Sequence, residues 1–213
     1  MATILIVGAS KGVGLEAVKA GLATGLTVRA MARTASSIAI DDPRLEKING
    51  SALSKADTAT ALTGVDAVIQ TIGISDFHSL IFGTTLFSSA TRVLVESMTA
   101  SGTKRLIALT GAGTGNSRGR INPLYDYVMF PIMLQRVYND KDIAEQIIMA
   151  SALDWTIARP GLLTSGAKTG HYKALPDMND WRGGFISRAD VADFLIKQVT
   201  DRTMIGQTPL LVN

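Results

Sequence analysis

The sequence predicts an α/β fold in which a doubly wound parallel sheet lies between two layers of helices. Three observations indicate this architecture. Short apolar runs alternate with helix-favouring segments along almost the whole chain, which is typical of parallel strands joined by crossover helices. The first apolar run leads into a glycine-rich turn and then a helix. Hydrophobic residues make up 46% of the 213 residues, which is enough for a substantial core.

The elements are expected in strict alternation from the amino terminus, and the pattern shows no internal repeat. The strands are short runs rich in valine, isoleucine and leucine, as expected when both faces of a sheet are buried. We expect them at residues 4–7, 26–32, 45–48, 65–71, 105–109, 155–158 and 210–212. We expect helices from 15 to near 25 and at 56–62, 86–100, 135–150 and 188–199, the last capped by Ser187.

Two stretches interrupt the alternation. A chain of this length fits one domain over residues 1–213, with insertions near 111–133 and 164–184. Both stretches follow strands, so both are expected at the carboxyl ends of the sheet, where open α/β folds bind ligands. We interpret them as the two walls of a loop-built substrate pocket, with surface elaboration as the alternative.

Composition excludes several classes of function. Lys and Arg number 21 against 18 Asp and Glu, a net charge of +3, and no basic block with interleaved aromatics predicts a nucleic-acid partner. There is no cysteine, and His78 and His171 lie far apart, so no metal site is expected. No apolar run has membrane-spanning length, so we expect no membrane partner and a cytoplasmic location. A monomer and a homodimer are both compatible with the sequence.

The glycine-rich turn carries the strongest functional signal. Free backbone N–H groups and the helix dipole at such a turn suit the pyrophosphate of a dinucleotide. Gly8 is expected to permit the tight turn, Gly12 the approach of the phosphates, and Gly14 the packing of the helix against the strand. The alternative is a tight connection without a cofactor. The expected binding residues are Gly8, Ser10, Lys11, Gly12, Val13 and Gly14.

The end of the second strand indicates which dinucleotide binds. An acidic residue there binds the ribose hydroxyls of NAD, whereas a basic residue accommodates the 2′-phosphate of NADP. This chain has no carboxylate until Asp41, but it has Arg33, whose guanidinium fork suits a phosphate. Ser36, Ser37 and Lys11 can add donors. We therefore predict NADP (NADPH) as the cofactor, and the alternative is that Arg33 only solvates the end of the strand.

Five segments, taken together, resemble the atypical short-chain dehydrogenase/reductase superfamily. They are residues 8–14, 64–69, 104–110, 154–161 and 186–192. The chain is most similar to the small NAD(P)H-binding members, which include flavin and biliverdin-IXβ reductases and NmrA-like proteins. The resemblance implies a Rossmann fold.

The resemblance also implies further cofactor contacts. Ser51-Ala52-Leu53 matches the segment beside the adenine, where Ser51 replaces the usual aspartate, so backbone groups are expected to contribute there. Thr71-Ile72-Gly73 matches the strand end beneath the riboses. Pro160-Gly161-Leu162 matches the stretch that flanks the nicotinamide amide. Thr110 matches a position beside the nicotinamide, and Lys141 matches a lysine that hydrogen-bonds its ribose.

One departure concerns proton transfer. Many relatives carry a tyrosine four residues before the lysine, but here that position is Val137, and Tyr138 is displaced by one. Tyr125 and Tyr127 lie in the first irregular stretch. Thr110 and Lys141 are therefore the candidate catalytic groups. The alternatives are that Thr110 satisfies a strand-end backbone group and that Lys141 is a solvated helix residue.

The sequence predicts an NADPH-dependent oxidoreductase that transfers a hydride to a small conjugated or carbonyl acceptor, such as a flavin or quinone. A flavin-like acceptor can take its proton from solvent, so the missing tyrosine does not prevent this chemistry. An NADP-sensing, NmrA-like regulator without catalysis is the second hypothesis. A nucleotide-sugar epimerase or dehydratase is the third, and it usually requires the tyrosine.

Overall fold

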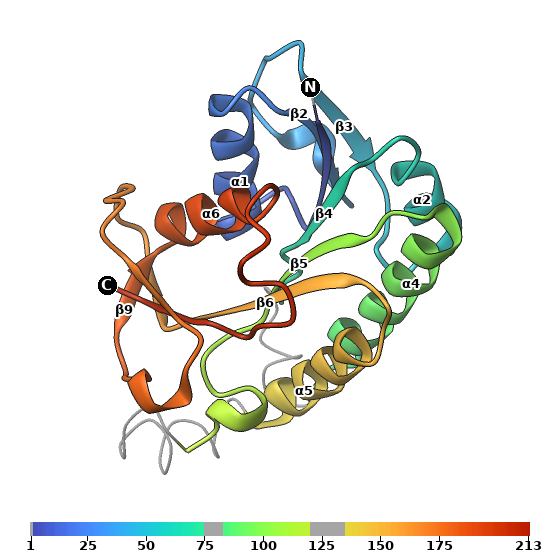
Figure 1. Cartoon of the computed structure of the whole chain (residues 1–213). Helices are drawn as coiled ribbons and strands as arrows, with labels where there is room; N and C mark the ends of the chain where they lie inside the picture. The colour runs from blue at the N-terminus through green and yellow to red at the C-terminus, as the bar shows by residue number, and fades with distance from the viewer. Residues whose placement is uncertain (1, 75–82, 120–134) are drawn as a thin grey trace.

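A parallel sheet forms the centre of the computed structural model, which describes residues 2–74, 83–119 and 135–213 (Figure 1). Among the described residues, eight strands form this main sheet, in the order β3-β2-β1-β4-β5-β6-β10-β8. Only β8 runs antiparallel to its neighbour, β10. This topology confirms the predicted doubly wound parallel sheet. The strands are β1 (Thr3–Val7), β2 (Thr27–Ala32), β3 (Leu45–Asn49), β4 (Ala67–Gln70), β5 (Arg105–Leu109), β6 (Asp154–Pro160), β8 (Lys173–Leu175) and β10 (Leu210–Val212).

Helices cover both faces of this sheet (Figure 1). On one face lie α1 (Gly12–Ala23) and α6 (Arg188–Lys197), which pack against each other. On the other lie α2 (Lys55–Ala61), α4 (Leu86–Ser101) and α5 (Gln135–Met149). From Ile4 to Val7, successive side chains of β1 alternate between the two cores, so all four residues are apolar. Among the described helices, none is both long and apolar enough to cross a membrane.

The second irregular stretch differs from the prediction. Residues 164–184 contain β8 at the edge of the main sheet and a short 3₁₀ turn, Met178–Asp180. The stretch is also flanked by β7 (Leu162–Thr164) and β9 (Phe185–Ser187), which form a separate parallel pair. These strands of three residues are too short to show a periodic pattern. Of the first stretch, 111–119 are described, whereas 120–134 lie outside the described residues.

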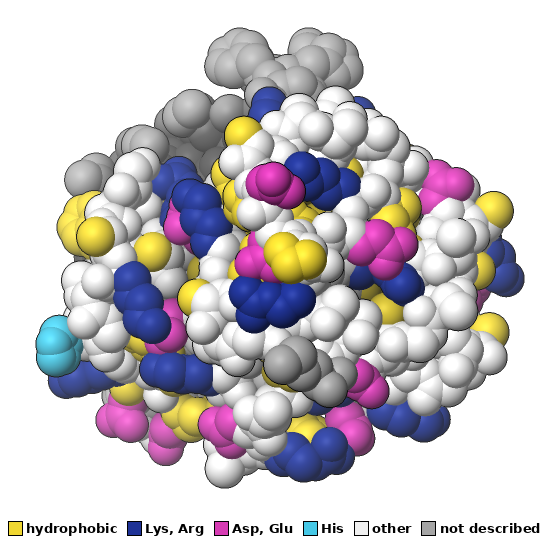
Figure 2. Space-filling model, turned by 90° about the horizontal axis from the view of Figure 1, so that it is seen from above, with side chains coloured by type: hydrophobic (Ala, Val, Ile, Leu, Met, Phe, Trp, Pro, Cys, Tyr) yellow, Lys and Arg dark blue, Asp and Glu magenta, His cyan; other side chains and the backbone are white. Residues whose placement is uncertain are grey.

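The register of the sheet determines where a ligand can bind. Val7 pairs with Gln70, Gln70 with Ala108, and Leu109 with Ala158, so β1, β4, β5 and β6 end at one edge. The glycine turn and the segments after β4, β5 and β6 therefore gather at this carboxyl edge. Figure 2 shows the molecule from above the view of Figure 1, where Lys and Arg side chains are interspersed with Asp and Glu.

Candidate cofactor and active site

The glycine turn after β1 is closely packed on its inner side and open on its outer side. Gly8 has a φ of +88°, and a Cβ there would lie 2.7 Å from the Thr71 carbonyl oxygen. A Cβ on Gly14 would lie 2.2 Å from the carbonyl oxygen of Gly8. Gly12 has a φ of +57°, and a Cβ there would meet no atom within 4 Å. At Gly8 and Gly14, neighbouring backbone lies too close for a side chain, so both positions require glycine. Gly12 instead faces open space.

The amino terminus of α1 has unsatisfied backbone donors. Its N-cap residue, Lys11, makes no capping bond, the first turn contains no acidic residue, and the first-turn amides meet no acceptor among the described residues. Val13 is buried in the core, so only its amide can face a ligand. Ser10 precedes the helix and is partly exposed. An uncapped helix start beside open space is a site for an anion.

The other α-helices whose starts are described have their donors occupied. The Ser54 hydroxyl accepts from an amide of α2, and the Ser187 hydroxyl accepts from an amide of α6, which confirms the predicted cap. At α4, the amides of Phe87 and Ser88 donate to the Asp140 carboxylate at 2.8 and 3.3 Å. Of α1, α2, α4 and α6, whose starts are all described, only α1 has first-turn amides that remain available to a ligand.

Arg33 follows β2 directly. Its side chain is exposed and forms no hydrogen bond or ion pair with any described residue. The neighbouring 3₁₀ turn (Ala35–Ser37) is held because the Ser36 amide donates to Asn49 and the Ser37 hydroxyl donates to a backbone carbonyl. Lys11 is also exposed. Both cations therefore remain available to an anionic ligand.

Arg29, for which the sequence indicates no role, is structural. Its guanidinium donates to Glu46 on β3 and to the backbone carbonyls of Ala61 and Thr63 at the end of α2. It therefore ties the second strand to its neighbours, while Arg33 does not.

The predicted adenine segment is stabilised by a residue that sequence reasoning missed. Asp57 on α2 accepts the Ser51 amide at 2.8 Å, and the Ser51 hydroxyl accepts the Leu53 amide. The Ser51 amide is therefore engaged internally and cannot serve adenine. What remains is the Ala52 backbone and the Leu53 side chain, which is 49% exposed and offers an apolar surface. The Ser54-x-x-Asp57 spacing at the helix start was the available signal.

At the end of β4, Thr71 has a structural role. Its hydroxyl is buried and donates to the carbonyl of Val7 at 3.0 Å, which holds β4 against the glycine turn. Ile72 packs into the core, and Gly73 is exposed. Of the three residues expected beneath the riboses, Gly73 therefore presents the most accessible backbone.

The structure brings Thr110 and Lys141 together. The Lys141 ammonium on α5 donates to the Thr110 carbonyl at 3.0 Å, just beyond β5. The Thr110 hydroxyl donates to Glu145 at 2.7 Å, so its proton is committed within the protein. This geometry argues against Thr110 as a proton donor to a substrate.

The Lys141 ammonium lies near two aromatic rings, 5.1 Å from the centroid of Phe87 and 4.7 Å from that of Tyr138. Burial lowers the pKa of Lys141 to about 8, and the Glu145 carboxylate opposes that shift. Tyr138 lies one helical turn before Lys141, and its hydroxyl is 3.0 Å from where a Cβ on Gly111 would stand. A tyrosine is thus beside the lysine despite the altered spacing.

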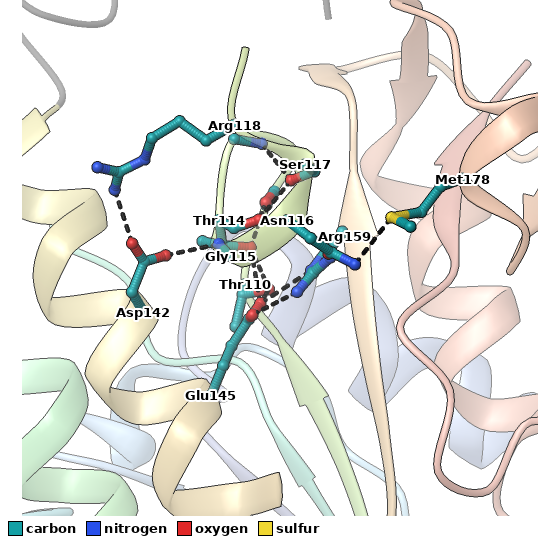
Figure 3. Close-up of polar contacts among 12 residues, drawn as sticks. Thr110, Thr114, Gly115, Asn116, Ser117, Arg118, Asp142, Glu145, Arg159 and Met178 are labelled. Atoms are coloured by element: carbon teal, nitrogen blue, oxygen red, sulfur yellow. Dashed lines mark hydrogen bonds and ion pairs between the residues drawn. The ribbon is translucent and has the colours of Figure 1, made fainter. Parts of the chain in front are cut away.

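A buried ion pair behind these residues was not predicted (Figure 3). Arg159 on β6 and Glu145 on α5 are 2.6 Å apart, and their side chains are 2% and 1% exposed. Glu145 also accepts the hydroxyls of Thr110 and Thr114. An arginine directly after the apolar pair Ile157-Ala158 of a predicted central strand was the available signal, because a buried charge requires a partner.

The stretch after β6 presents apolar side chains. Pro160 is buried, and a Cβ on Gly161 would lie 2.4 Å from the carbonyl of Gly184, so the chain passes close to a neighbouring segment. Leu162 on β7 is 50% exposed, and its register partner Phe185 on β9 is 60% exposed. These side chains border the predicted nicotinamide end.

Some candidates have no assigned place in this site. His78, Tyr125 and Tyr127 lie outside the described residues. His171 is exposed, and its amide donates to Thr169. No group of three or more potential metal ligands occurs among residues 2–74, 83–119 and 135–213.

The family is established by a match to the NAD(P)H-binding family model over residues 8–202. The chain belongs to this NAD(P)H-binding family. The resemblance predicted from the sequence is therefore confirmed. The match includes the glycine turn, Arg33, Thr110, Lys141 and the Arg159-Pro160 segment.

Proteins similar to this NAD(P)H-binding protein include a sugar epimerase and an oxidoreductase. A curated relative is the uncharacterized sugar epimerase YhfK of Bacillus subtilis, 29% identical over 149 residues, which are 70% of this chain. The match spans 64% of YhfK, less than two thirds of its length. The oxidoreductase YlbE of Lactococcus lactis has a TM-score of 0.83 at 25% identity, with 99% of this chain and 90% of that one covered.

Two further structures are informative. ChuY, an anaerobillin reductase from Escherichia coli O157:H7, has a TM-score of 0.80 at 26% identity, with 99% and 96% of the chains covered. A short-chain dehydrogenase/reductase from Veillonella parvula in complex with NADP has a TM-score of 0.84, with 100% and 94% covered. Its identity is 17%, so it supports the fold alone.

Proposed function

We propose that the protein is an NADPH-dependent oxidoreductase that transfers a hydride to a small conjugated or carbonyl acceptor. The observation that carries the proposal is the uncapped start of α1, whose amides face the open space beside Gly12. A pyrophosphate satisfies these donors and interacts favourably with the helix dipole. The oxidoreductase and reductase relatives at 25% and 26% identity support the same class of reaction.

Arg33 supports NADP over NAD. The residue lies at the end of β2, where the adenosine ribose is bound in this fold, and it is exposed and unpaired among the described residues. A guanidinium recognises a phosphate through two parallel hydrogen bonds. Lys11, at the start of α1, adds a second positive charge.

The remaining polar groups suit a reaction in which placement matters more than acid catalysis. When bound, NADPH supplies the hydride. Lys141 is anchored on the Thr110 carbonyl, and we expect its ammonium to bind the nicotinamide ribose and to stabilise negative charge on the acceptor. The exposed Leu162 and Phe185 offer an apolar surface to a flat acceptor. With the Thr110 proton donated to Glu145, the acceptor takes its proton from solvent.

The test is NADPH consumption in the presence of a panel of flavins, quinones and aldehydes, followed by absorbance. We expect oxidation with at least one conjugated acceptor. Tight NADP binding without oxidation by any acceptor supports the regulatory alternative, which is favoured by Val137 at the position of the usual tyrosine. That same substitution weakens the epimerase hypothesis, which the similarity to YhfK suggests. Absence of NADP and NAD binding would overturn the whole proposal.

A further inference from the structure

The buried pair Glu145–Arg159 lies at the junction of three elements that border the proposed reaction site (Figure 3). Two guanidinium nitrogens of Arg159 donate to the two Glu145 oxygens at 3.1 and 2.6 Å. The pair therefore joins β6 to α5 in a fixed bidentate geometry. Neither side chain can reach solvent, since both are almost completely buried.

The Glu145 side of the pair contacts the candidate catalytic groups. One carboxylate oxygen accepts the hydroxyls of Thr110 and Thr114 at 2.7 and 2.6 Å, which holds the segment after β5. Glu145 is also one helical turn beyond Lys141 on α5, so the two side chains lie on the same side of that helix. Glu145 thus holds Thr110 through its hydroxyl, and the carbonyl of the same Thr110 accepts a hydrogen bond from the Lys141 ammonium.

The Arg159 side contacts two loops, the segment after β5 and the segment from Met178 to Trp181. Its third nitrogen donates to Asn116, which lies in the segment after β5. Asn116 in turn contacts the sulfur of Met178 at 3.0 Å. The face of the guanidinium lies 5.7 Å from the ring of Trp181. Because Arg159 is also paired with Glu145 on α5, these contacts fix the loops around 116 and 178–181 relative to that helix.

Stability alone does not explain this pair. Removing two charges from water costs about as much as their attraction returns, and apolar side chains of similar volume often do equally well. The pair also imposes a constraint on its surroundings. A Cβ on Gly115 would lie 2.7 Å from an Arg159 nitrogen and 3.1 Å from a Glu145 oxygen, so the loop backbone packs directly on it.

We infer that Glu145 and Arg159 are positioning residues, which align Lys141 and Thr110 with the two acceptor-side loops during hydride transfer. The inference rests on the proposed function. It assigns neither residue contact with the cofactor or the acceptor. It predicts that disturbing the pair lowers kcat and leaves binding of the dinucleotide phosphates unchanged. The proposed phosphate site is at the start of α1, away from the pair.

The main test is the double variant Glu145→Leu/Arg159→Met, which removes both charges and keeps the volume. We expect it to fold, with NADP affinity within about threefold of wild type, because two strands, β4 and β5, separate the glycine turn after β1 from Arg159 on β6. We expect kcat to fall by roughly tenfold to 100-fold, the cost of misplaced catalytic groups. Unchanged kcat in the folded double variant would overturn the inference.

A second test uses two glycines of the same loop. Gly115→Ala pushes a methyl group onto the pair, while Gly119→Ala also has a positive φ but meets no atom of the described residues within 4 Å. We expect a loss of kcat for Gly115→Ala alone. Equal effects of the two substitutions would show that loop strain, and not the pair, is responsible, which contradicts the inference.

A readout independent of turnover separates this inference from the proposed function. The fluorescence of bound NADPH reports the surroundings of the nicotinamide ring, and we expect it to change in the double variant and in Gly115→Ala. If wild-type protein binds NADPH but reduces no acceptor, the proposed function fails. In that case, unchanged fluorescence in both variants overturns the positioning role, and changed fluorescence supports it.

Discussion

At the scale of single residues, we expect Arg33 to decide between NADP and NAD. Replacing it with alanine removes a charged donor that no described residue occupies. We expect Arg33→Ala to weaken NADP binding by roughly tenfold to 100-fold, the value of hydrogen bonds to a charged group, with NAD binding little changed. Calorimetric titration with both dinucleotides measures this. Arg92→Ala, on the exposed surface of α4, is the control, and equal losses for NADP and NAD would contradict the assignment.

The lowered pKa of Lys141 leads to a prediction of how activity depends on pH. Because burial lowers the pKa of Lys141 to about 8, the side chain is charged below that pH and loses its charge above it. We expect kcat to decline as pH rises through about 8, and Lys141→Met to abolish this alkaline limb. Rate measurements from pH 6 to 10 with one acceptor, at about one-unit steps, suffice. An alkaline limb that persists in Lys141→Met would assign the titration to another group.

The same shift has a consequence for stability with the opposite sign. The pKa of Lys141 in the folded state lies below its ordinary value, so the unfolded chain binds more protons between about pH 8 and 10. Through this group, the free energy of unfolding therefore rises with pH across that window. The pH dependences of activity and of stability are thus expected to diverge.

At the scale of elements, substitutions at two glycines of the turn after β1 should affect stability and dinucleotide binding differently. Gly14→Ala would place a Cβ 2.2 Å from a backbone oxygen, so α1 must move away from β1. We expect it to lower the free energy of unfolding by more than about 3 kcal/mol, at the upper end of overpacking effects.

Gly12→Ala is its matched partner, because a Cβ there meets no atom within 4 Å and only the positive φ is strained. We expect it to cost about 1–2 kcal/mol and to abolish tight dinucleotide binding. Urea unfolding and NADP titration of both variants test this pair. Normal NADP binding by Gly12→Ala would contradict the proposal that the phosphates bind at this turn.

A second element-scale prediction concerns the start of α6. The buried Asp190 carboxylate accepts the Thr169 and Gly170 amides and the Ser187 hydroxyl, all at 2.8 Å. Burial alone would raise the pKa of Asp190, but these hydrogen bonds together lower it. We expect Asp190→Asn to cost about 2–3 kcal/mol, with exposed Asp180→Asn as the control.

The stability contributed by Asp190 is expected to be present above the ordinary pKa of an aspartate and to disappear as pH falls through the lowered value. The difference in unfolding free energy between wild type and Asp190→Asn should therefore shrink in acid. A difference that stays constant down to acid pH would mean that Asp190 does not titrate differently on folding.

At the scale of the whole molecule, cofactor binding should stabilise the fold. Ligand at 100 times its Kd adds about 2.7 kcal/mol to the free energy of unfolding. For a chain of 213 residues this corresponds to a rise in Tm of roughly 5–11 °C. We expect NADP to produce this rise and NAD at the same concentration a smaller one, in a thermal melt. No shift with either dinucleotide would contradict the proposed function.

Most of the sheet could be predicted from the sequence because its signals are local. The apolar runs at β1, β4 and β5 and the glycine turn before α1 each show their character within a few residues. The strands β7, β8 and β9 have three residues each and contain polar residues, unlike the equally short but wholly apolar β10, and their pairing is decided by neighbours distant in the sequence.

The candidate site divides in the same way. The sequence alone determined the family, and it was enough to predict a pyrophosphate at the glycine turn and a phosphate at Arg33, because contiguous residues carry each signal. Only the tertiary structure decided that Glu145 joins Arg159 and Thr110 and that Asp140 occupies the start of α4, leaving α1 uncapped. Buried polar groups must find partners wherever the packing of α5 against β6 and α4 supplies them, and such long-range pairings leave no local pattern in the sequence.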